Sequence, residues 1–314
     1  MNEKWLKKAC TVLRNAAEGP PPAFDFGQTL TGFSGERLLA CLHGLTNALC
    51  DKDRVYMEIG VFQGLTLISN AKVNPTIRCI GIDNFSLFNE GRDNYETVRQ
   101  RMTQLGVENA TVINKDFEDA LRNLTHDLQG RRIGLLFVDG AHDYRSQLVS
   151  LLKAKAYLAE DCAIVVDDSN YAHVRQANAD FLHAHPEFAL LMEAYTPGHM
   201  ANLTEKDRSD ASAGFWNGVN VMFHDPRGRI ERAFPREESK ELYFQSHDVF
   251  RHEFAELAFD ALKAVQASLD SSEPRPNALV EIQRAFAEHR RRHPDRFRHQ
   301  NTRSEGLPAF RLYC

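Results

Sequence analysis

The sequence predicts an α/β fold built around a parallel sheet. Five short runs between residues 55 and 166 are nearly continuously apolar, as a parallel strand covered on both faces must be. Segments with helical periodicity separate these runs, which is typical of repeated strand–helix–strand units. The runs span residues 55–59, 78–82, 110–114, 133–138 and 162–166.

Acidic residues accompany the ends of all five runs. Glu58 lies within the first run, and an aspartate lies at or just beyond the end of each of the others: Asp83, Asp116, Asp139 and the pair Asp167–Asp168. The carboxyl ends of parallel strands lie at one edge of the sheet, where open α/β sheets bind ligands. The sequence therefore predicts an acidic ligand site at this edge.

A loop with two glycines four positions apart follows the first run. Gly60 and Gly64 permit positive φ angles or a close approach of a ligand to the backbone. Thr66 then opens an amphipathic helix whose free N–H groups face the same crevice. The spacing E-x-G-x-x-x-G differs from the G-x-G-x-x-G of dinucleotide enzymes and lacks the Lys-Ser/Thr of phosphate-binding loops.

Length and composition limit the classes of protein. The 314 residues suffice for one large α/β domain with helical additions or for two small domains. The hydrophobic share of 43% and charged share of 26% predict a soluble globular protein, and a net charge of −5 argues against a nucleic-acid binder. No apolar run predicts a membrane span or a signal peptide. Six cysteines without a C-x-x-C pair favour reduced thiols in a cytoplasmic protein.

The order of these residues resembles the class I S-adenosylmethionine-dependent methyltransferases, specifically the small-molecule O-methyltransferases of the macrocin, cephalosporin-biosynthesis and catechol types. The resemblance covers residues 50–225, and its most specific element is Asp139-Gly-x-His142-x-Tyr144. It implies a Rossmann-like, doubly wound, seven-stranded and mostly parallel sheet with an antiparallel last strand. Residues 188–194 and 218–223 are the candidates for strands six and seven.

Helical segments are predicted on both sides of this core. The expected division is residues 1–50 as an N-terminal helical cap, 51–228 as the cofactor-binding core and 229–314 as a C-terminal helical extension. Amphipathic patterns predict the flanking helices at residues 3–17, 35–50, 249–269 and 277–293. For the N-terminal pair, packing on the outside of the sheet is an equally good interpretation of the pattern.

The resemblance implies S-adenosylmethionine as the cofactor. It assigns cofactor contacts to Glu58, Gly60, Gly64, Thr66, Asp83, Asp116 and Asp139. Asp83 is expected to accept hydrogen bonds from both ribose hydroxyls, with a helix N-cap as the alternative. Asp116 is expected near the adenine, or as the cap of a helix over residues 117–124.

Carboxylates from two neighbouring strand ends predict a metal site. Asp139, Asp167 and Asp168 would repel one another unless a divalent cation lay between them, and oxygen ligands suit Mg²⁺ or Mn²⁺. The resemblance places metal ligands at the same three positions, with Asn170 in reserve. Such a cation would bind substrate oxygens and lower the pKa of the attacking hydroxyl.

His142 and Asp139 are the predicted catalytic residues. A neutral imidazole is suited to accept the hydroxyl proton near pH 7, whereas the alternative for His142 is a helix cap. Tyr144 is expected to pack or hydrogen-bond, and His173 is a lesser candidate for substrate contact or for the base. In the polar insertion over residues 196–217, the side chains of His199, Phe215 and Trp216 are expected to line a ring-shaped acceptor or to pack at the start of the last strand.

These features together predict a metal-assisted O-methyltransferase acting on a small hydroxylated molecule, a sugar or a natural-product scaffold. The alternatives are a metal-independent methyltransferase and a non-catalytic cofactor-binding protein. For the arginines near residues 290–298, the expected roles are a solvated helix end, a contact with an acidic partner or the binding of nucleic acid. The negative net charge of the chain disfavours nucleic-acid binding. Homo-oligomerisation through the terminal helices is a further expectation.

Overall fold

The computed structural model describes residues 3–19, 29–88, 93–237 and 306–313, together with six positions between residues 280 and 291. Those six positions are helical and fall within the predicted helix over residues 277–293. The predicted helix over residues 249–269 lies outside the described residues. Of the arginines at residues 290–298, Arg291 is the described one, and it pairs with Glu288 at 2.8 Å.

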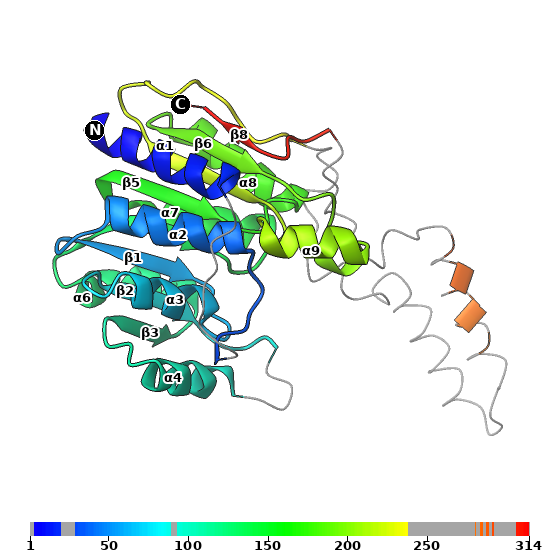
Figure 1. Cartoon of the computed structure of the whole chain (residues 1–314), viewed down its shortest axis with the longest axis horizontal. Coiled ribbons are helices and arrows are strands. Elements are labelled where there is room, and N and C mark those ends of the chain that lie inside the picture. The colour runs from blue at the N-terminus through cyan, green and yellow to red at the C-terminus, as the bar shows by residue number, and fades with distance from the viewer. Residues whose placement is uncertain are drawn as a thin grey trace, which may run out of the picture.

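In the part of the chain that the structure describes, eight strands form a single sheet in the order β3-β2-β1-β4-β5-β7-β6-β8 (Figure 1). Their bounds are β1 Arg54–Ile59, β2 Cys79–Asp83, β3 Ala110–Asn114, β4 Arg132–Val138, β5 Leu158–Val166, β6 Phe188–Ala194, β7 Val219–His224 and β8 Arg311–Leu312. The seven predicted strands are all present, and β7 runs antiparallel to β5 and β6 as expected. The count of seven was too low, because β8 pairs with the outer edge of β6.

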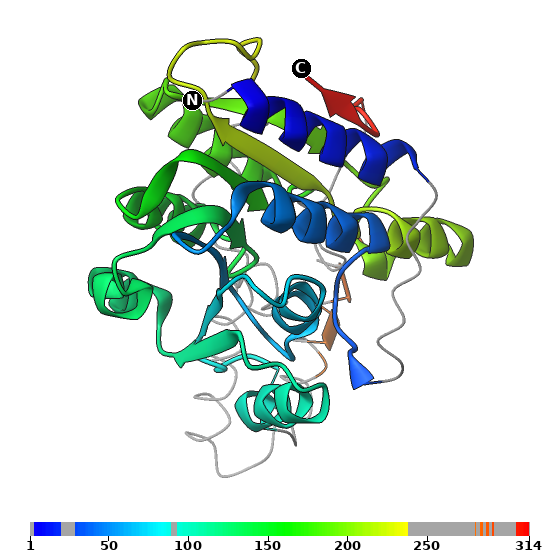
Figure 2. The same cartoon turned by 60° about the vertical axis from the view of Figure 1, so that its left-hand side comes forward.

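Helices cover both faces of the sheet (Figures 1 and 2). The described helices are α1 Glu3–Glu18, α2 Glu36–Leu49, α3 Leu65–Val73, α4 Asn94–Gln104, α5 Phe117–Arg122, α6 Leu124–Leu128, α7 Tyr144–Lys155, α8 Ala172–Ala184 and α9 Glu205–Ala213, with a 3₁₀ turn η2 at Met200–Asn202. The first four pack on one face of the sheet. Helices α5 to α8 pack on the other.

Strand β1 shows how the sequence divides its side chains between these two cores. Tyr56 faces the side of α1 to α4, whereas Val55, Met57 and Ile59 face the side of α5 to α8. All four are at most 3% exposed. Because each such side chain contributes roughly 1.5–3 kcal/mol when removed from water, the alternation fixes the register of the strand.

The N-terminal helices do not cover the ligand edge of the sheet. Leu38, Leu42 and Leu45 of α2 are fully buried against the sheet, and α1 packs on α2. The prediction of a helical cap is therefore wrong for the helices themselves, and the alternative interpretation of the amphipathic pattern is correct. Of the described residues before α2, the loop residues Gly32, Phe33 and Ser34 line the cavity at the ligand edge.

The strand order reverses at β1, whose neighbours are β2 and β4. Such a switch point opens a crevice at the carboxyl ends of the strands. Gly60 closes the end of β1 with a φ of +94°, and a Cβ there would lie 1.9 Å from the carbonyl oxygen of Asp139. Only glycine fits, so the Gly60 loop and the end of β4 meet directly.

The insertion between β6 and β7 is ordered into secondary structure rather than being a continuous loop. It contains η2 and α9, and the Thr204 hydroxyl caps α9 by accepting a hydrogen bond from the N–H of Asp207 at 3.2 Å. The carbonyl of Gly214 accepts a hydrogen bond from the N–H of Arg37 at 3.1 Å. The end of α9 therefore lies against the start of α2.

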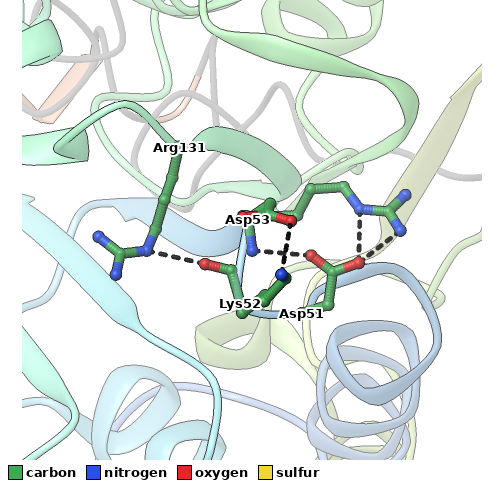
Figure 3. A network of polar contacts seen from close by, with 5 residues as sticks. Asp51, Lys52, Asp53 and Arg131 are labelled. Carbon is green, nitrogen blue, oxygen red and sulfur yellow. Dashed lines mark hydrogen bonds and ion pairs between the residues drawn. The ribbon is translucent and has the colours of Figure 1, made fainter.

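Charged residues at the amino edge of the sheet form mutually paired contacts (Figure 3). The Arg54 guanidinium donates to Asp51 Oδ2 through Nε at 3.1 Å and Nη2 at 2.7 Å, and lies 4.1 Å from the centre of the Trp5 ring. Arg131 Nε donates to the carbonyl of Lys52 at 2.9 Å. These contacts fasten the turn before β1 to the start of β4 and to α1.

The cysteines differ from the prediction at one position. Cys41, Cys50, Cys79 and Cys162 are free, buried thiols, and burial raises the pKa of Cys41 to about 12. Cys10 on α1 is disulfide-bonded, which corrects the expectation that the thiols are all reduced. Within the described residues, no helix is long and apolar enough to cross a membrane.

Candidate active site

A cavity of about 700 Å³ opens at the carboxyl edge of the sheet. Its described lining contains four carboxylates and two imidazoles but no lysine or arginine. The carboxylates are those of Asp83, Asp116, Asp139 and Asp168, and the imidazoles are those of His142 and His199. The predicted acidic site is thus a real concavity, and its field favours cations.

Asp83 organises the glycine loop. Its Oδ2 accepts hydrogen bonds from the backbone N–H groups of Val61 and Phe62, both at 2.8 Å, and its Oδ1 accepts one from Phe85 at 2.7 Å. The helix-cap alternative does not hold, because Asp93 caps the helix that follows β2. The carboxylate lines the cavity, so it is placed to meet a ligand while it holds the loop.

Glu58 and Gly64 lie outside the cavity lining, whereas Thr66 is part of it. The fully buried Glu58 carboxyl accepts hydrogen bonds from the hydroxyls of Tyr56 at 2.6 Å and Thr66 at 3.2 Å. Burial raises the pKa of Glu58 to about 8. Gly64 begins α3 with a φ of +83°. Glu58 is therefore placed to act on a ligand only through Thr66.

Asp116 caps a helix, as the alternative interpretation expected, and it also lies at the cavity. Its side chain caps α5 by accepting a hydrogen bond from the N–H of Glu118 at 2.8 Å. The same residue and its neighbour Phe117 line the cavity.

Asp139, His142 and Asp168 form the polar centre of the cavity. One ligand atom from each lies within 4.8 Å of the others, and His142 Nε2 lies 3.0 Å from Asp168 Oδ2. Asp168 reaches this position with a φ of +56°. Burial, followed by the charges of Asp167 and Asp168, raises the pKa of Asp139 well above its ordinary value.

Asp167 does not belong to this donor set, although its charge acts on Asp139. It is 3% exposed, does not line the cavity, and accepts a hydrogen bond from the N–H of Asp168 at 2.8 Å. Asn170 is also engaged elsewhere, since its amide donates to the carbonyl of Thr196 at 2.9 Å and to the Thr196 hydroxyl at 3.0 Å. The three donors that fit a divalent cation are Asp139, His142 and Asp168, so His142 stands where Asp167 was expected.

His142 is oriented by stacking rather than by helix capping. Its ring lies 5.3 Å from that of Tyr171 at an interplanar angle of 12°. Asp143 caps α7, which removes the capping alternative for His142. Tyr144 donates a hydrogen bond to Asp180 at 2.7 Å, as a packing residue would. His173 is fully buried outside the lining, and burial lowers its pKa to about 4.

Several residues of the site were not predicted. Asn217 is fully buried, donates to Asp168 Oδ1 through Nδ2, and accepts a hydrogen bond from the N–H of Asn170 through its carbonyl at 3.0 Å. Phe33, Phe62 and Phe88 line the cavity with the expected Trp216 and His199, whereas Phe215 packs into the core. These residues lie on separate loops, and no short motif links them.

Residues 57–169 match the family model of a methyltransferase domain. The chain contains a methyltransferase domain. The match runs from β1 to the turn after β5, and so includes the Gly60 loop and all four carboxylates of the cavity. The predicted methyltransferase is confirmed at this level.

Solved structures with a similar course of the chain include O-methyltransferases. An O-methyltransferase from Bacillus cereus in complex with SAH is 13% identical, with 72% of this chain and 92% of that chain covered and a TM-score of 0.45. The O-methyltransferase TomG from Streptomyces achromogenes, involved in tomaymycin synthesis and solved in complex with SAM, is 17% identical, with 72% and 91% covered and a TM-score of 0.45. No curated protein sequence matches this chain.

Proposed function

We propose that this methyltransferase transfers the methyl group of S-adenosylmethionine to a hydroxyl oxygen of a small molecule, a sugar or a natural-product scaffold, with a divalent cation assisting. The observation that carries the proposal is the cavity lined by four carboxylates without a lysine or arginine among its described residues.

The charge of the cavity suits this cofactor. S-adenosylmethionine carries a sulfonium and an ammonium against a single carboxylate, so an acidic lining attracts it. A dinucleotide would instead require donors for its pyrophosphate. Asp83 is the last residue of β2 and Asp116 follows β3, at the positions expected for the ribose and the adenine. The sulfonium would then lie toward Asp139 at the switch point.

Methyl transfer requires the acceptor oxygen to lose a proton as it attacks. The oxygen forms a bond to the methyl carbon while the S–CH₃ bond breaks, and the products are a methyl ether, S-adenosylhomocysteine and a proton. Asp139, His142 and Asp168 would hold Mg²⁺ or Mn²⁺, which supplies a Lewis acid that lowers the pKa of the bound hydroxyl. The Asn217 amide holds Asp168, one of the three donors, by donating a hydrogen bond to its Oδ1.

A metal-independent reaction is the second candidate, and the contact of His142 with Asp168 at 3.0 Å favours it. In this case His142 takes the proton from the hydroxyl and Asp168 stabilises the imidazolium that forms. The two candidates differ in the role of His142, which is a ligand in the first and the base in the second.

Calorimetric titration of the purified protein with S-adenosylhomocysteine tests the cofactor. We expect micromolar binding, and a folded sample that does not bind would contradict the whole proposal. Initial rates with S-adenosylmethionine and a panel of diols, measured with Mg²⁺ and after chelation by EDTA, then separate the two candidates. Activity that EDTA removes and Mg²⁺ restores supports the cation, whereas unchanged activity supports His142 as the base.

A further inference from the structure

Four aromatic rings meet at the mouth of the cavity and form what we call the aromatic wall: Phe33, Phe62, Phe88 and Trp216. Phe33 stacks on Phe62 with ring centres 5.2 Å apart and lies 6.3 Å from Phe88 and 6.1 Å from Trp216. The rings of Phe62 and Phe88 are 5.7 Å apart, edge to face. Each ring comes from a different loop, so the fold assembles the wall from separate segments.

The aromatic wall contains side chains that are unusually exposed for large apolar residues. Phe33 is 56% exposed and Phe88 is 55% exposed, and the adjoining Leu87 is also 55% exposed. Among the described residues these are the three most exposed large apolar side chains, and all three line the cavity. A contiguous apolar surface at the rim of a pocket is typical of a ligand-binding site.

The backbone under the wall is strained. Phe62, Phe88 and Trp216 have φ angles of +50°, +57° and +54°. Bulky residues rarely adopt this left-handed region, which costs of order 1–3 kcal/mol per residue and is characteristic of functional sites. Three of the four rings of the wall are therefore held in position at the expense of local stability.

The wall adjoins the polar centre at Trp216, because the next residue, Asn217, contacts Asp168. The wall places apolar rings beside this polar centre, and its Phe62 also adjoins Asp83, which accepts a hydrogen bond from the Phe62 N–H at 2.8 Å. Such a site suits a molecule with a flat apolar body and hydroxyls along one edge. A polyol would place several hydroxyls against carbon without hydrogen-bond partners, which is unfavourable.

We propose that the aromatic wall binds the methyl acceptor, and that the acceptor is a planar aromatic molecule carrying adjacent hydroxyls rather than a sugar. The proposal rests on the proposed function and narrows its substrate class. Stacking on the wall would hold the ring while the hydroxylated edge points to Asp139, His142 and Asp168.

Trp216 provides a direct probe of binding, because the chain contains only two tryptophans. Trp5 lies on α1 at the opposite edge of the sheet, and Trp5→Phe keeps a ring for Arg54 to cover. In this variant, saturated with S-adenosylhomocysteine and Mg²⁺, we expect 3,4-dihydroxycinnamate to quench the remaining fluorescence with a saturable curve. Methyl α-rhamnoside, which offers a sugar diol, should leave the signal unchanged.

A variant pair tests the wall by affinity. Phe33→Ala removes the ring that touches the other three, and we expect it to weaken binding of 3,4-dihydroxycinnamate roughly tenfold. The affinity for S-adenosylhomocysteine should stay within about twofold of that of the parent protein. Leu152→Ala, at a residue of α7 that is 43% exposed and outside the cavity, is the control and should change neither affinity.

Failure of this proposal differs from failure of the proposed function. Transfer of the methyl group to the sugar diol but not to any dihydroxylated aromatic would overturn the aromatic acceptor and keep the methyltransferase. Equal affinity of the parent and Phe33→Ala for the aromatic acceptor would overturn the role of the wall. Only the absence of S-adenosylhomocysteine binding would reject the function on which both depend.

Discussion

The two edges of the sheet carry their charges in opposite ways. At the amino edge, Asp51 is matched by Arg54 at 2.7 Å, and both groups are partly exposed to water. At the carboxyl edge, four carboxylates line one cavity whose described lining contains no lysine or arginine. The pKa of Asp139 there is raised by burial and by neighbouring acids.

We infer from this difference that the charges at the amino edge stabilise the fold, whereas those at the carboxyl edge serve to bind a ligand. An exposed ion pair such as Asp51–Arg54 contributes little to the free energy of unfolding and needs no further partner. An unmatched acidic group in a cavity lowers the stability of the empty protein, and that cost is offset only when cations bind. Four experiments test the contrast, from the largest expected effect to the smallest.

Asp139→Asn should lower activity without lowering stability. We expect the initial rate of methyl transfer to fall roughly 10²–10³-fold, because the donor set of the polar centre loses one of its three members. The thermal midpoint should stay constant or rise, since a buried repulsion is removed. Rate assays and calorimetric melting measure the two effects. A large fall in the thermal midpoint would show that Asp139 holds the fold instead.

Glu58→Gln should change how stability depends on pH. The folded pKa of about 8 lies above the ordinary value of 4.5, so the folded protein binds the proton more tightly than the unfolded chain. Stability from this group is therefore complete below pH 4.5 and is lost as the pH rises toward 8, by up to about 4–5 kcal/mol.

The glutamine variant cannot lose this proton. Its free energy of unfolding should exceed that of the parent at pH 8–9, and the two should converge at pH 5. Urea unfolding at both pH values measures the difference. Parallel curves for the two proteins would mean that Glu58 titrates normally. Glu160→Gln, at an exposed position of β5, is the matched control.

Asn217→Ala should lower kcat roughly tenfold while leaving the affinity for S-adenosylhomocysteine unchanged. The amide fixes Asp168 through Oδ1, so its loss frees the carboxylate to move from His142. The pH profile of the rate should shift as well, which a purely structural role would not produce. Asn217→Asp keeps the shape of the side chain but adds charge repulsion with Asp168, so its kcat should be no higher than that of Asn217→Ala. Recovery by aspartate would contradict the donor role.

Asp51→Ala, at the amino edge, should have the smallest effect. We expect a loss of about 0.5–1 kcal/mol in the free energy of unfolding and no change in the rate, because the pair with Arg54 is partly exposed and distant from the cavity. Urea unfolding and the standard rate assay test this together. A loss of activity would remove the distinction between the two edges.

Local patterns in the sequence were sufficient for the strands and the acidic edge. Each parallel strand is a short apolar run, and β1 to β7 lie within a few residues of their predicted positions. The amphipathic pattern of α2 was not sufficient to predict where this helix packs, because a helix with one apolar face packs equally well on a sheet or over a crevice. Tertiary contacts decide between these, and they place Leu42 on the sheet.

The composition of the polar centre could not be predicted from the local sequence. Asp167 and Asp168 are equivalent in the sequence, yet consecutive side chains point in different directions at the end of a strand. The φ of +56° at Asp168 directs its carboxylate to His142, while Asp167 is buried away from the cavity. Asn217 joins this centre from a turn that lies 49 positions farther along the chain, a separation that no local pattern reveals.

The short strand β8 has a consequence for handling the protein. It pairs with Met192 and Glu193 of β6, and Tyr313 beside it donates a hydrogen bond to Glu193 at 2.8 Å. All seven residues of β6 are buried. A chain shortened to the residues before 238 would leave the backbone of this apolar strand open along one side, which is a template for edge-to-edge aggregation. Strand β8 and Tyr313 therefore protect the edge of β6 against aggregation as well as extending the sheet.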